Sequence, residues 1–405
     1  MTRLPAGSFQ LMKSLNRSLI LNTIRKDGPI SRADIAKKTQ LTPPTVSNLV
    51  NELLETNLVI ESSQGESKGG RKPTMLIINA KNFYIIGLDV GAKSIKGVLA
   101  NLNADILNSV SLSLSHPLTN ALFLNQMDEV VEQLLANTSA YNSDHILGIG
   151  VAMHGIVDVT EGASIYAPSL QLRDIPIKAH LEERFKMLVK VENDARALAL
   201  GEAWYGNGMD ISSFMCINIG YGIGAGIIID GKLHHGDDFL MGEIGHMTID
   251  PDGPVCSCGN SGCLQALAAG PFIAERARKR ITEGQESLLA EMVSDLEDIT
   301  SELIFQGAKQ NDALCIDILK EAGTYLGIGI TNLIHIVNPS LILLSGGVTK
   351  AGHFIFDSLR ETVKARGLTE KAKQTKIEEA KLGEHGTAIG AISLLLVEMF
   401  ATQNR

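Results

Sequence analysis

The sequence is poor in cysteine, in aromatic side chains and in long apolar runs. It contains 5 Cys among 405 residues, and Phe, Trp and Tyr together make up 4%. We therefore expect a mainly aliphatic core. No apolar run reaches the roughly 18 residues that a membrane span needs. Residues 1–18 lack the apolar stretch and cleavage site of a secretory signal. These absences favour a cytoplasmic protein, and disulfides are rare in that compartment.

Length and charge indicate more than one domain. A chain of 405 residues is too long for one compact core. Residues 1–80 hold 11 Lys and Arg against 6 Asp and Glu, a net charge of +5, whereas the remaining residues carry a net charge of −14. A small basic segment beside a large acidic one is expected where only the first faces a polyanion. Chance clustering of charge is the plain alternative.

Residues 1–80 have the pattern of a winged helix-turn-helix. Apolar residues at helical spacing predict a helix over residues 8–27, which Gly28 and Pro29 end. Ser31 is the expected cap of the next helix, SRADIAKKT, and QLTPP forms a turn before a third helix, TVSNLVNELLETN. The segments LVIES, GESKGGRKP and TMLIIN follow as strand, loop and strand, which is a wing.

The polar face of the third helix and the wing are the candidate DNA-binding surface. Small hydrogen-bonding side chains on a helix suit the reading of base edges, and basic residues beside glycines suit phosphates or a narrow minor groove. The alternative is a helical protein–protein module with a solvated basic loop. The candidate DNA-binding residues are Thr45, Ser47, Asn48, Asn51, Arg71 and Lys72.

From Tyr84 onward, short aliphatic segments that end in glycine-rich turns alternate with helical segments. YIIGLDVGAKSIKGVLANLNADIL predicts three strands joined by turns, and FMCINIGYGIGAGIIIDGKL predicts a further hairpin. AIGAISLLLVEMF predicts a closing helix. This alternation indicates an α/β fold.

Four metal-ligating side chains fall within a short glycine-rich stretch. Cys256, Cys258 and Cys263 lie in a knuckle that follows His246. Three thiolates and one imidazole form a closed tetrahedral set that suits structural zinc. The alternatives are a disulfide and unbound reduced thiols, of which a reducing compartment disfavours the first. We expect zinc, with a role in holding the loop and none in chemistry.

The motifs GLDVGAKSIKG, ENDARALALGE, NIGYGIGAG, GEIGHM, CSCGNSGC and LLSGGV occur in this order. In this order they resemble the ROK family of repressors, open reading frames and sugar kinases. With the N-terminal winged helix-turn-helix, the resemblance extends over the full chain to the repressor branch. It is closest to the xylose-repressor type, and similar to repressors that respond to N-acetylglucosamine or glucose.

The resemblance implies a particular architecture. After the winged helix-turn-helix, residues 1–80, it implies a two-lobed body with the actin/hexokinase-like (ribonuclease H-like) ATPase fold. The first lobe would comprise residues 81–200 with the C-terminal helix 387–405. The second lobe, residues 201–386, would carry the zinc-binding loop. A sugar cleft between the lobes and a homodimer or homotetramer are implied as well.

The resemblance also implies sugar-binding residues in this cleft. Asn193 and Asp194 match a pair that contacts sugar hydroxyls in the family, as do Glu243 and His246. The alternative for Asp194 is a helix cap. Two positions depart from the family pattern: Ser169 stands where Asn is common, and Gln265 stands where Glu is usual. These departures leave the identity of the ligand open.

Phosphoryl transfer is disfavoured by the glycine turns, although Asp194 matches the catalytic base of family kinases. Those kinases carry Asp-x-Gly-Gly-Thr where this chain has Asp89-Val90-Gly91-Ala92-Lys93, and Tyr221 replaces a Thr in the second turn. We therefore expect a repressor of carbohydrate genes without enzyme activity, released from double-stranded operator DNA by a sugar. The alternatives are a sugar kinase with a DNA-binding head and a repressor controlled by a sugar-transport protein.

Overall fold

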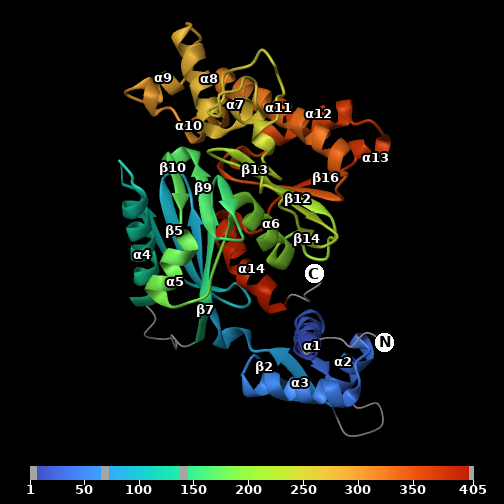
Figure 1. The fold of residues 1–405 in the computed structure, drawn as a ribbon. Coiled ribbons are helices and arrows are strands. Elements are labelled where there is room, and N and C mark those ends of the chain that lie inside the picture. Colours follow the sequence, from blue (N-terminus) through green and yellow to red (C-terminus); the bar gives the residue numbers. More distant parts are fainter. Residues whose placement is uncertain (1–6, 65–72, 116, 137–144, 401–405) are drawn as a thin grey trace.

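The computed structural model describes residues 7–64, 73–115, 117–136 and 145–400. Residues 7–78 form a small unit, here called the head, and residues 80–400 form a larger one, the body (Figure 1). The predicted Arg71 and Lys72 of the wing lie outside the described residues. Among the helices that the structure describes, none is both long and apolar enough to cross a membrane.

The head is a winged helix-turn-helix, as predicted. Its three-stranded sheet has the order β1-β3-β2. The two-residue strand β1 was not predicted, and it pairs antiparallel with β3 through Ile30 and Leu76. The elements are α1 (Gly7–Asp27), β1 (Ile30–Ser31), α2 (Arg32–Thr39), α3 (Pro43–Glu55), β2 (Val59–Gln64) and β3 (Thr74–Ile78).

Side-chain caps fix where the two helices of the helix-turn-helix begin. Ser31 caps α2 as predicted, and its hydroxyl oxygen accepts from the Asp34 N–H at 3.1 Å. Helix α3 begins two residues earlier than predicted, because Thr42 is its N-cap and Pro43 its first residue. Proline is tolerated there because the first-turn N–H groups have no partner within a helix. One face of α3 is buried in the head core: Val46, Leu49, Val50 and Leu53.

The first part of the body is built on a five-stranded sheet with the order β11-β7-β4-β5-β6. Helix α4 packs on β5 and β6, and a small sheet of order β10-β9-β8 adjoins it. The elements are β4 (Tyr84–Val90), β5 (Ser94–Asn101), β6 (Ile106–Ser113), α4 (Asn120–Ala136), β7 (Ile146–Met153), β8 (Ile156–Asp158), β9 (Ala163–Ala167), β10 (Leu172–Ile175), α5 (Ile177–Phe185), β11 (Val189–Asn193) and α6 (Asp194–Tyr205).

The second part repeats the plan with a sheet of order β14-β13-β12-β15-β16. Helices α7 to α12 cover it and bury the largest aliphatic core of the chain. The elements are β12 (Phe214–Ile219), β13 (Ile223–Ile229), β14 (Lys232–Leu233), α7 (Leu264–Ala268), α8 (Gly270–Thr282), α9 (Leu289–Met292), α10 (Ser301–Lys309), α11 (Ala313–Val337), β15 (Leu341–Ser345), α12 (His353–Arg366), α13 (Glu370–Lys373), β16 (Lys376–Glu379) and α14 (Gly386–Phe400).

Helices α6 and α14 pack against each other between the two sheets (Figure 1). The two helices approach very closely, because a Cβ on Gly390 would lie 2.0 Å from the Ala197 carbonyl oxygen. Helix α14 is equally close to β7, where a Cβ on Gly150 would lie 1.9 Å from the Ala391 carbonyl oxygen. Helix α6 also packs on β12 and β13, so it belongs to both halves of the body. The lobe boundary expected at residue 200 falls inside this helix, which continues to Tyr205 because its whole length is packed.

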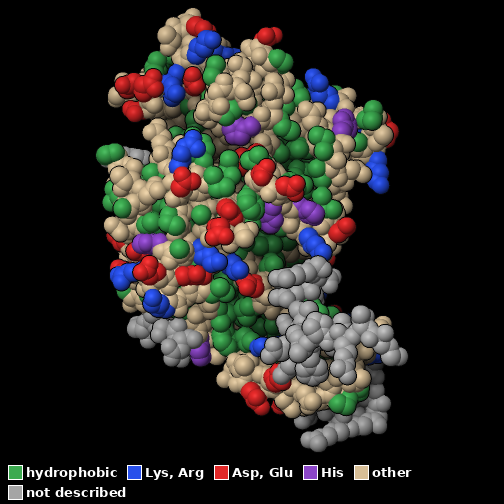
Figure 2. Space-filling model, in the orientation of Figure 1, with side chains coloured by type: hydrophobic (Ala, Val, Ile, Leu, Met, Phe, Trp, Pro, Cys, Tyr) green, Lys and Arg blue, Asp and Glu red, His purple; other side chains and the backbone are tan. Residues whose placement is uncertain are grey.

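The head and body share one apolar core. Ile20 and Ile24 of α1 lie in the same buried cluster as Ile392 and Leu396 of α14. At the edge of this cluster the Arg25 guanidinium lies 4.1 Å from the ring centre of Trp204, at the end of α6. In Figure 2 apolar side chains continue from the body toward the head where the two meet. The head is therefore packed against the body rather than tethered by a linker.

Candidate functional site

Three strands of the first sheet end at the same edge of the body. The parallel register places Val90 of β4 and Asn193 of β11 on either side of Met153 of β7. Carboxyl ends of adjacent parallel strands are where α/β folds gather their ligand-binding side chains. Here that edge carries Asp89, His154 and Asp194.

Asn193 and Asp194 open helix α6, and they have different local roles. Asn193 is the N-cap: its Oδ1 accepts from the N–H groups of Ala195 and Arg196, and its Nδ2 donates to the Gly155 carbonyl at 2.9 Å. The capping role that was the alternative for Asp194 therefore belongs mainly to Asn193. One Asp194 oxygen accepts from the Ala195 N–H, and a sugar role for either residue stays a prediction.

The charge of Asp194 raises the pKa of two other acidic side chains, Asp89 at the same edge and Glu243. Burial, followed by the charge of Asp194, raises the pKa of Asp89 to about 7. The same two causes raise the pKa of Glu243 to about 7. Burial also raises the pKa of Asp194 itself. The structure thus brings together Asp194 and Glu243, two predicted sugar-binding residues, in a cluster with Asp89.

A buried ion-pair network connects α6 to the segment that leads to Glu243. Arg196 is 1% exposed; it donates to Glu192 at 2.8 Å and to the carbonyl of Phe239 at 2.8 Å. His235 lies 2.7 Å from the other Glu192 oxygen. Burial alone would raise the pKa of Glu192, but its bonds to His235 and Arg196 lower it. The sequence analysis missed this network. Its only signal in the sequence is the i,i+4 spacing of Glu192 and Arg196.

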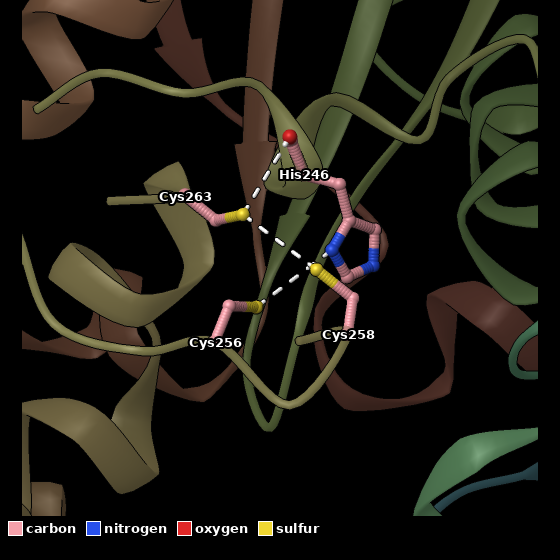
Figure 3. Close-up of side chains that lie close together, drawn as sticks. All are labelled: His246, Cys256, Cys258 and Cys263. Atoms are coloured by element: carbon pink, nitrogen blue, oxygen red, sulfur yellow. Dashed lines mark hydrogen bonds between the residues drawn. The ribbon is translucent and has the colours of Figure 1, made fainter. Parts of the chain in front are cut away.

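The four predicted metal ligands converge. Their ligand atoms all lie within 4.8 Å of one another, although the residues come from separate turns (Figure 3). The Sγ atoms of Cys258 and Cys263 are 3.7 Å apart, and Cys256 Sγ lies 3.8 Å from His246 Nδ1. A tetrahedron with zinc–sulfur distances of about 2.3 Å has edges of about 3.8 Å. A disulfide needs sulfurs about 2.05 Å apart, so the geometry fits a tetrahedral metal ion.

His246 links this cluster to the carboxylates. It lies in the short 3-10 turn Ile244–His246 that follows Glu243, and its N–H donates to the Glu243 carbonyl at 3.1 Å. Its Nδ1 faces the thiols, whereas Nε2 points away from them (Figure 3). Burial lowers the pKa of His246, so its ring is neutral and able to ligate. Fixing the ring therefore also fixes the backbone that carries Glu243.

The Gln265 side chain has two hydrogen-bond partners within the body. Its Oε1 accepts from the Ile223 N–H at 3.2 Å, and its Nε2 donates to the Ser257 hydroxyl at 3.3 Å. The side chain thus bridges the end of the glycine turn between β12 and β13 and the loop that carries the clustered cysteines. The Ile223 N–H, at the first residue of β13, therefore already has a side-chain partner. A sugar contact by Gln265 stays a prediction.

Ser169 lies exposed on the 3-10 turn Pro168–Leu170. This turn is close to the end of β7, because Pro168 Cδ is 3.0 Å from where a Cβ on Gly155 would lie. In the structure Ser169 makes no hydrogen bond with the other predicted sugar-binding residues. Its place in the site stays a prediction.

The described DNA-binding candidates all lie on α3. Asn48 and Asn51 are exposed, and Thr45 and Ser47 are half-buried. Two of them already have side-chain partners: the Asn51 Oδ1 accepts from Arg32 at 3.2 Å, and the Thr45 hydroxyl is 2.8 Å from that of Thr42. Asn48 is thus the most available of the four for a base edge.

Comparisons with known proteins agree with this division of the chain. Residues 85–398 match the model of the ROK family, and residues 14–60 match that of winged helix-turn-helix DNA-binding domains. A putative xylose repressor of Caldicellulosiruptor sp. (strain Rt8B.4) is 33% identical over 395 residues, which are 98% of each chain. The DNA-binding transcriptional dual regulator NagC of Escherichia coli (strain K12) is 30% identical and is covered over 94% of its length.

Solved structures divide into those that match the whole chain and those that match the body. The crystal structure of a ROK family transcriptional regulator, a homologue of the E. coli MLC protein, has a TM-score of 0.86 and 26% identity over 97% of this chain and 98% of that one. A ROK family glucokinase from Streptomyces griseus, solved with glucose and AMPPNP, has a TM-score of 0.70 and 27% identity over 77% of this chain and 98% of its own. The chain belongs to the ROK family, with a winged helix-turn-helix domain preceding the family's two-lobed body.

Proposed function

We propose that the chain is a sequence-specific DNA-binding transcriptional regulator, a repressor of carbohydrate genes, and that a sugar bound in its body controls its hold on the operator. The observation that carries this proposal is the match to proteins named repressors over the whole length, head included. The glucokinase, in contrast, matches only about three quarters of this chain.

The glycine turns of the body support a regulator over a kinase. Ala92 adds a methyl group where the backbone of a kinase approaches a phosphate, and Tyr221 places a bulky ring in the second turn. The Ile223 N–H of that turn bonds to Gln265. Phosphoryl transfer depends on the positioning of phosphates by such groups, so these changes disfavour it.

In this proposal the head binds DNA through α3, with Asn48 and Asn51 toward the base edges and the wing, with Arg71 and Lys72, along the backbone. A symmetric homodimer, or a homotetramer built from such dimers, would present two heads to a palindromic operator. Because the operator is part of the chromosome, the proposal includes a cytoplasmic location.

The sugar would lie between the start of α6 and the segment around Glu243. Asp194 and Glu243 come from the two lobes proposed for the body, residues 81–200 with 387–405 and residues 201–386. A ligand that bridges them favours one arrangement of the lobes over the other, and only such a difference in affinity can shift the protein between two states. Helix α6 runs from Asp194 to Tyr205, and Trp204 in its last turn contacts Arg25 of the head, so a change at one end can reach the other.

We propose zinc as the metal that His246, Cys256, Cys258 and Cys263 would hold. The donor set and its spacing fit zinc, and four protein ligands leave no open position for a reacting molecule. The site would then stabilise the loop that Gln265 joins to the glycine turn. Metal analysis tests this: the purified protein should contain near-equimolar zinc, and Cys258→Ser should lower that content.

The function is tested by selecting bound sequences from a random duplex pool, then measuring release of the selected duplex by xylose, glucose and N-acetylglucosamine. At least one sugar should release the wild-type protein without any protein partner. Asp194→Ala should bind the duplex with unchanged affinity and resist release. Asp357→Ala, an exposed change on α12, is the matched control and should respond like the wild type.

Two outcomes would contradict the proposal. Absence of any preferred duplex would overturn the DNA-binding function. Release of the Asp194→Ala variant at the wild-type sugar concentration would overturn the placement of the sugar. Release that needs an added transport protein would favour the partner-controlled alternative, and ADP production with a sugar and ATP would favour the kinase.

A further inference from the structure

His154 is a polar residue at the strand edge that neither the motifs nor the resemblance singled out. It directly follows β7, and the register of β7 places it between the end of β4, with Asp89, and the start of α6, with Asp194. Its main chain is held in place because the next residue, Gly155, accepts the Asn193 side-chain bond at 2.9 Å. The residue is therefore fixed among the acidic side chains of the candidate site.

The hydrogen bond of the ring to β4 determines which nitrogen carries the proton. His154 Nδ1 lies 3.2 Å from the Val90 carbonyl oxygen, which can only accept a hydrogen bond. Nδ1 therefore donates. Burial lowers the pKa of His154 and keeps the ring neutral, although the nearby Asp194 opposes this. In a neutral ring with the proton on Nδ1, Nε2 is a hydrogen-bond acceptor.

This acceptor has no partner. Nε2 of His154 is buried and makes no hydrogen bond to any described residue. A buried polar atom without a partner lowers stability, so such atoms in native proteins need an explanation. The neighbouring side chains cannot supply one while ionised, because carboxylates such as Asp194 and Asp89 only accept. Whenever these carboxyl groups are ionised, the missing partner is a donor that comes from outside the chain.

We propose that His154 is a further sugar-binding residue, whose Nε2 accepts a hydrogen bond from a hydroxyl group of an uncharged sugar beside Asp194. A hydroxyl is the donor that suits this site, since a neutral imidazole acceptor and several carboxyl groups repel an anionic ligand. The proposal rests on the proposed sugar-controlled function, and it adds the residue and the charge class of the ligand.

The burial of Nε2 gives this contact a second consequence. A sugar can reach the atom only when the side chains that cover it move, so the contact forms in an arrangement different from the described one. A ligand that bonds to Nε2 therefore binds that other arrangement more tightly. Such a difference is the physical requirement for a sugar to change the state of a repressor.

Two nearly isosteric variants separate the roles of the two ring nitrogens. His154→Asn keeps a donor at the position of Nδ1, toward the Val90 carbonyl, but has no atom at the position of Nε2. His154→Gln has an amide oxygen or nitrogen near the position of Nε2 and no donor at that of Nδ1. The full-length proteins are titrated calorimetrically with xylose, glucose and N-acetylglucosamine, and their thermal midpoints and operator affinities are measured alongside.

We expect His154→Asn to keep the thermal midpoint and operator affinity of the wild type, while its Kd for the bound sugar rises about tenfold, as for one lost hydrogen bond of about 1.4 kcal/mol. His154→Gln should bind the sugar more tightly than His154→Asn does, even if its midpoint is lower. Sugar binding by the wild type and His154→Asn with equal Kd would overturn the role of His154 and leave the proposed function intact. A wild type that binds the selected duplex but no sugar would overturn both.

Discussion

Asp89 provides a test of the electrostatics of the strand edge, because its carboxyl group is costly to keep ionised. The pKa of Asp89 rises from 3.8 to about 7, through burial first and the charge of Asp194 second. A carboxyl whose pKa is higher in the folded protein lowers stability above its unfolded pKa. The loss grows as the pH rises from about 4 to about 7 and is constant above that.

Asp89→Asn removes this loss, since an amide has the shape of a protonated carboxyl group and does not ionise. At about 1.36 kcal/mol per pH unit, ionisation of Asp89 lowers the free energy of unfolding of the wild type by about 2 kcal/mol at pH 5.5. At pH 8 it lowers this free energy by about 4 kcal/mol. Unfolding entropy of about 2.1 cal/mol/K per residue makes 1 kcal/mol worth about 1 °C in a chain of this length. The thermal midpoint of the variant should therefore exceed that of the wild type by about 3 °C at pH 5.5 and about 5 °C at pH 8.

Scanning calorimetry at the two pH values measures this difference directly. Asp357→Asn, an exposed change on α12, is the control and should shift the midpoint little at either pH. The reasoning is refuted if Asp89→Asn gains equally at both pH values, or if its midpoint falls below that of the wild type at pH 8. Either result would mean that the carboxylate is paired or solvated in the folded chain.

Three further predictions concern the head, the packing and the ligand. Asn48→Ala should weaken binding to the selected duplex about tenfold, because it removes a base contact of about 1–3 kcal/mol, and the Kd for the sugar should not change. If an anisotropy titration gives the variant the same operator affinity as the wild type, Asn48 does not lie in the interface. Gly150→Ala should lower the thermal midpoint by several degrees, because its Cβ would lie 1.9 Å from the Ala391 carbonyl oxygen, and an unchanged midpoint would contradict that close packing. The phosphate ester of the bound sugar should bind at least about tenfold more weakly than the sugar itself, because Asp194 and Glu243 repel its charge. Equal Kd values for the sugar and its ester, measured by calorimetry, would contradict an acidic site.

Local features of the sequence predicted the head well. The caps and turns that bound its helices depend on residues close together in the sequence, such as Ser31 and Asp34. The apolar face of α3 follows from the helical spacing of its apolar residues. The error at the start of α3 was also local: the Thr42 hydroxyl accepts from the Thr45 N–H, so the helix begins at Pro43. The cluster of possible metal ligands could be predicted for the same reason, since Cys256, Cys258 and Cys263 are neighbours in the chain.

Contacts between distant segments could not be predicted in the same way. The bond of Gln265 to the Ile223 N–H joins residues 42 positions apart, and only the fold shows that this amide reaches the strand that follows a glycine turn. The Glu192–His235 pair and the acceptor on His154 depend likewise on which strands adjoin. A buried histidine at a strand end carries no signal in the sequence until its neighbours are known.

The shared core of head and body has a consequence for how the chain can be shortened. Helix α14 closes the first sheet and also covers Ile20 and Ile24 of α1. A truncation before Gly386 would therefore expose apolar surface on both the head and the body. An isolated fragment 1–80 would likewise expose the apolar face of α1 that α14 covers in the full chain. Dissecting this protein into separately soluble modules should require new polar side chains on α1, in addition to a cut after β3.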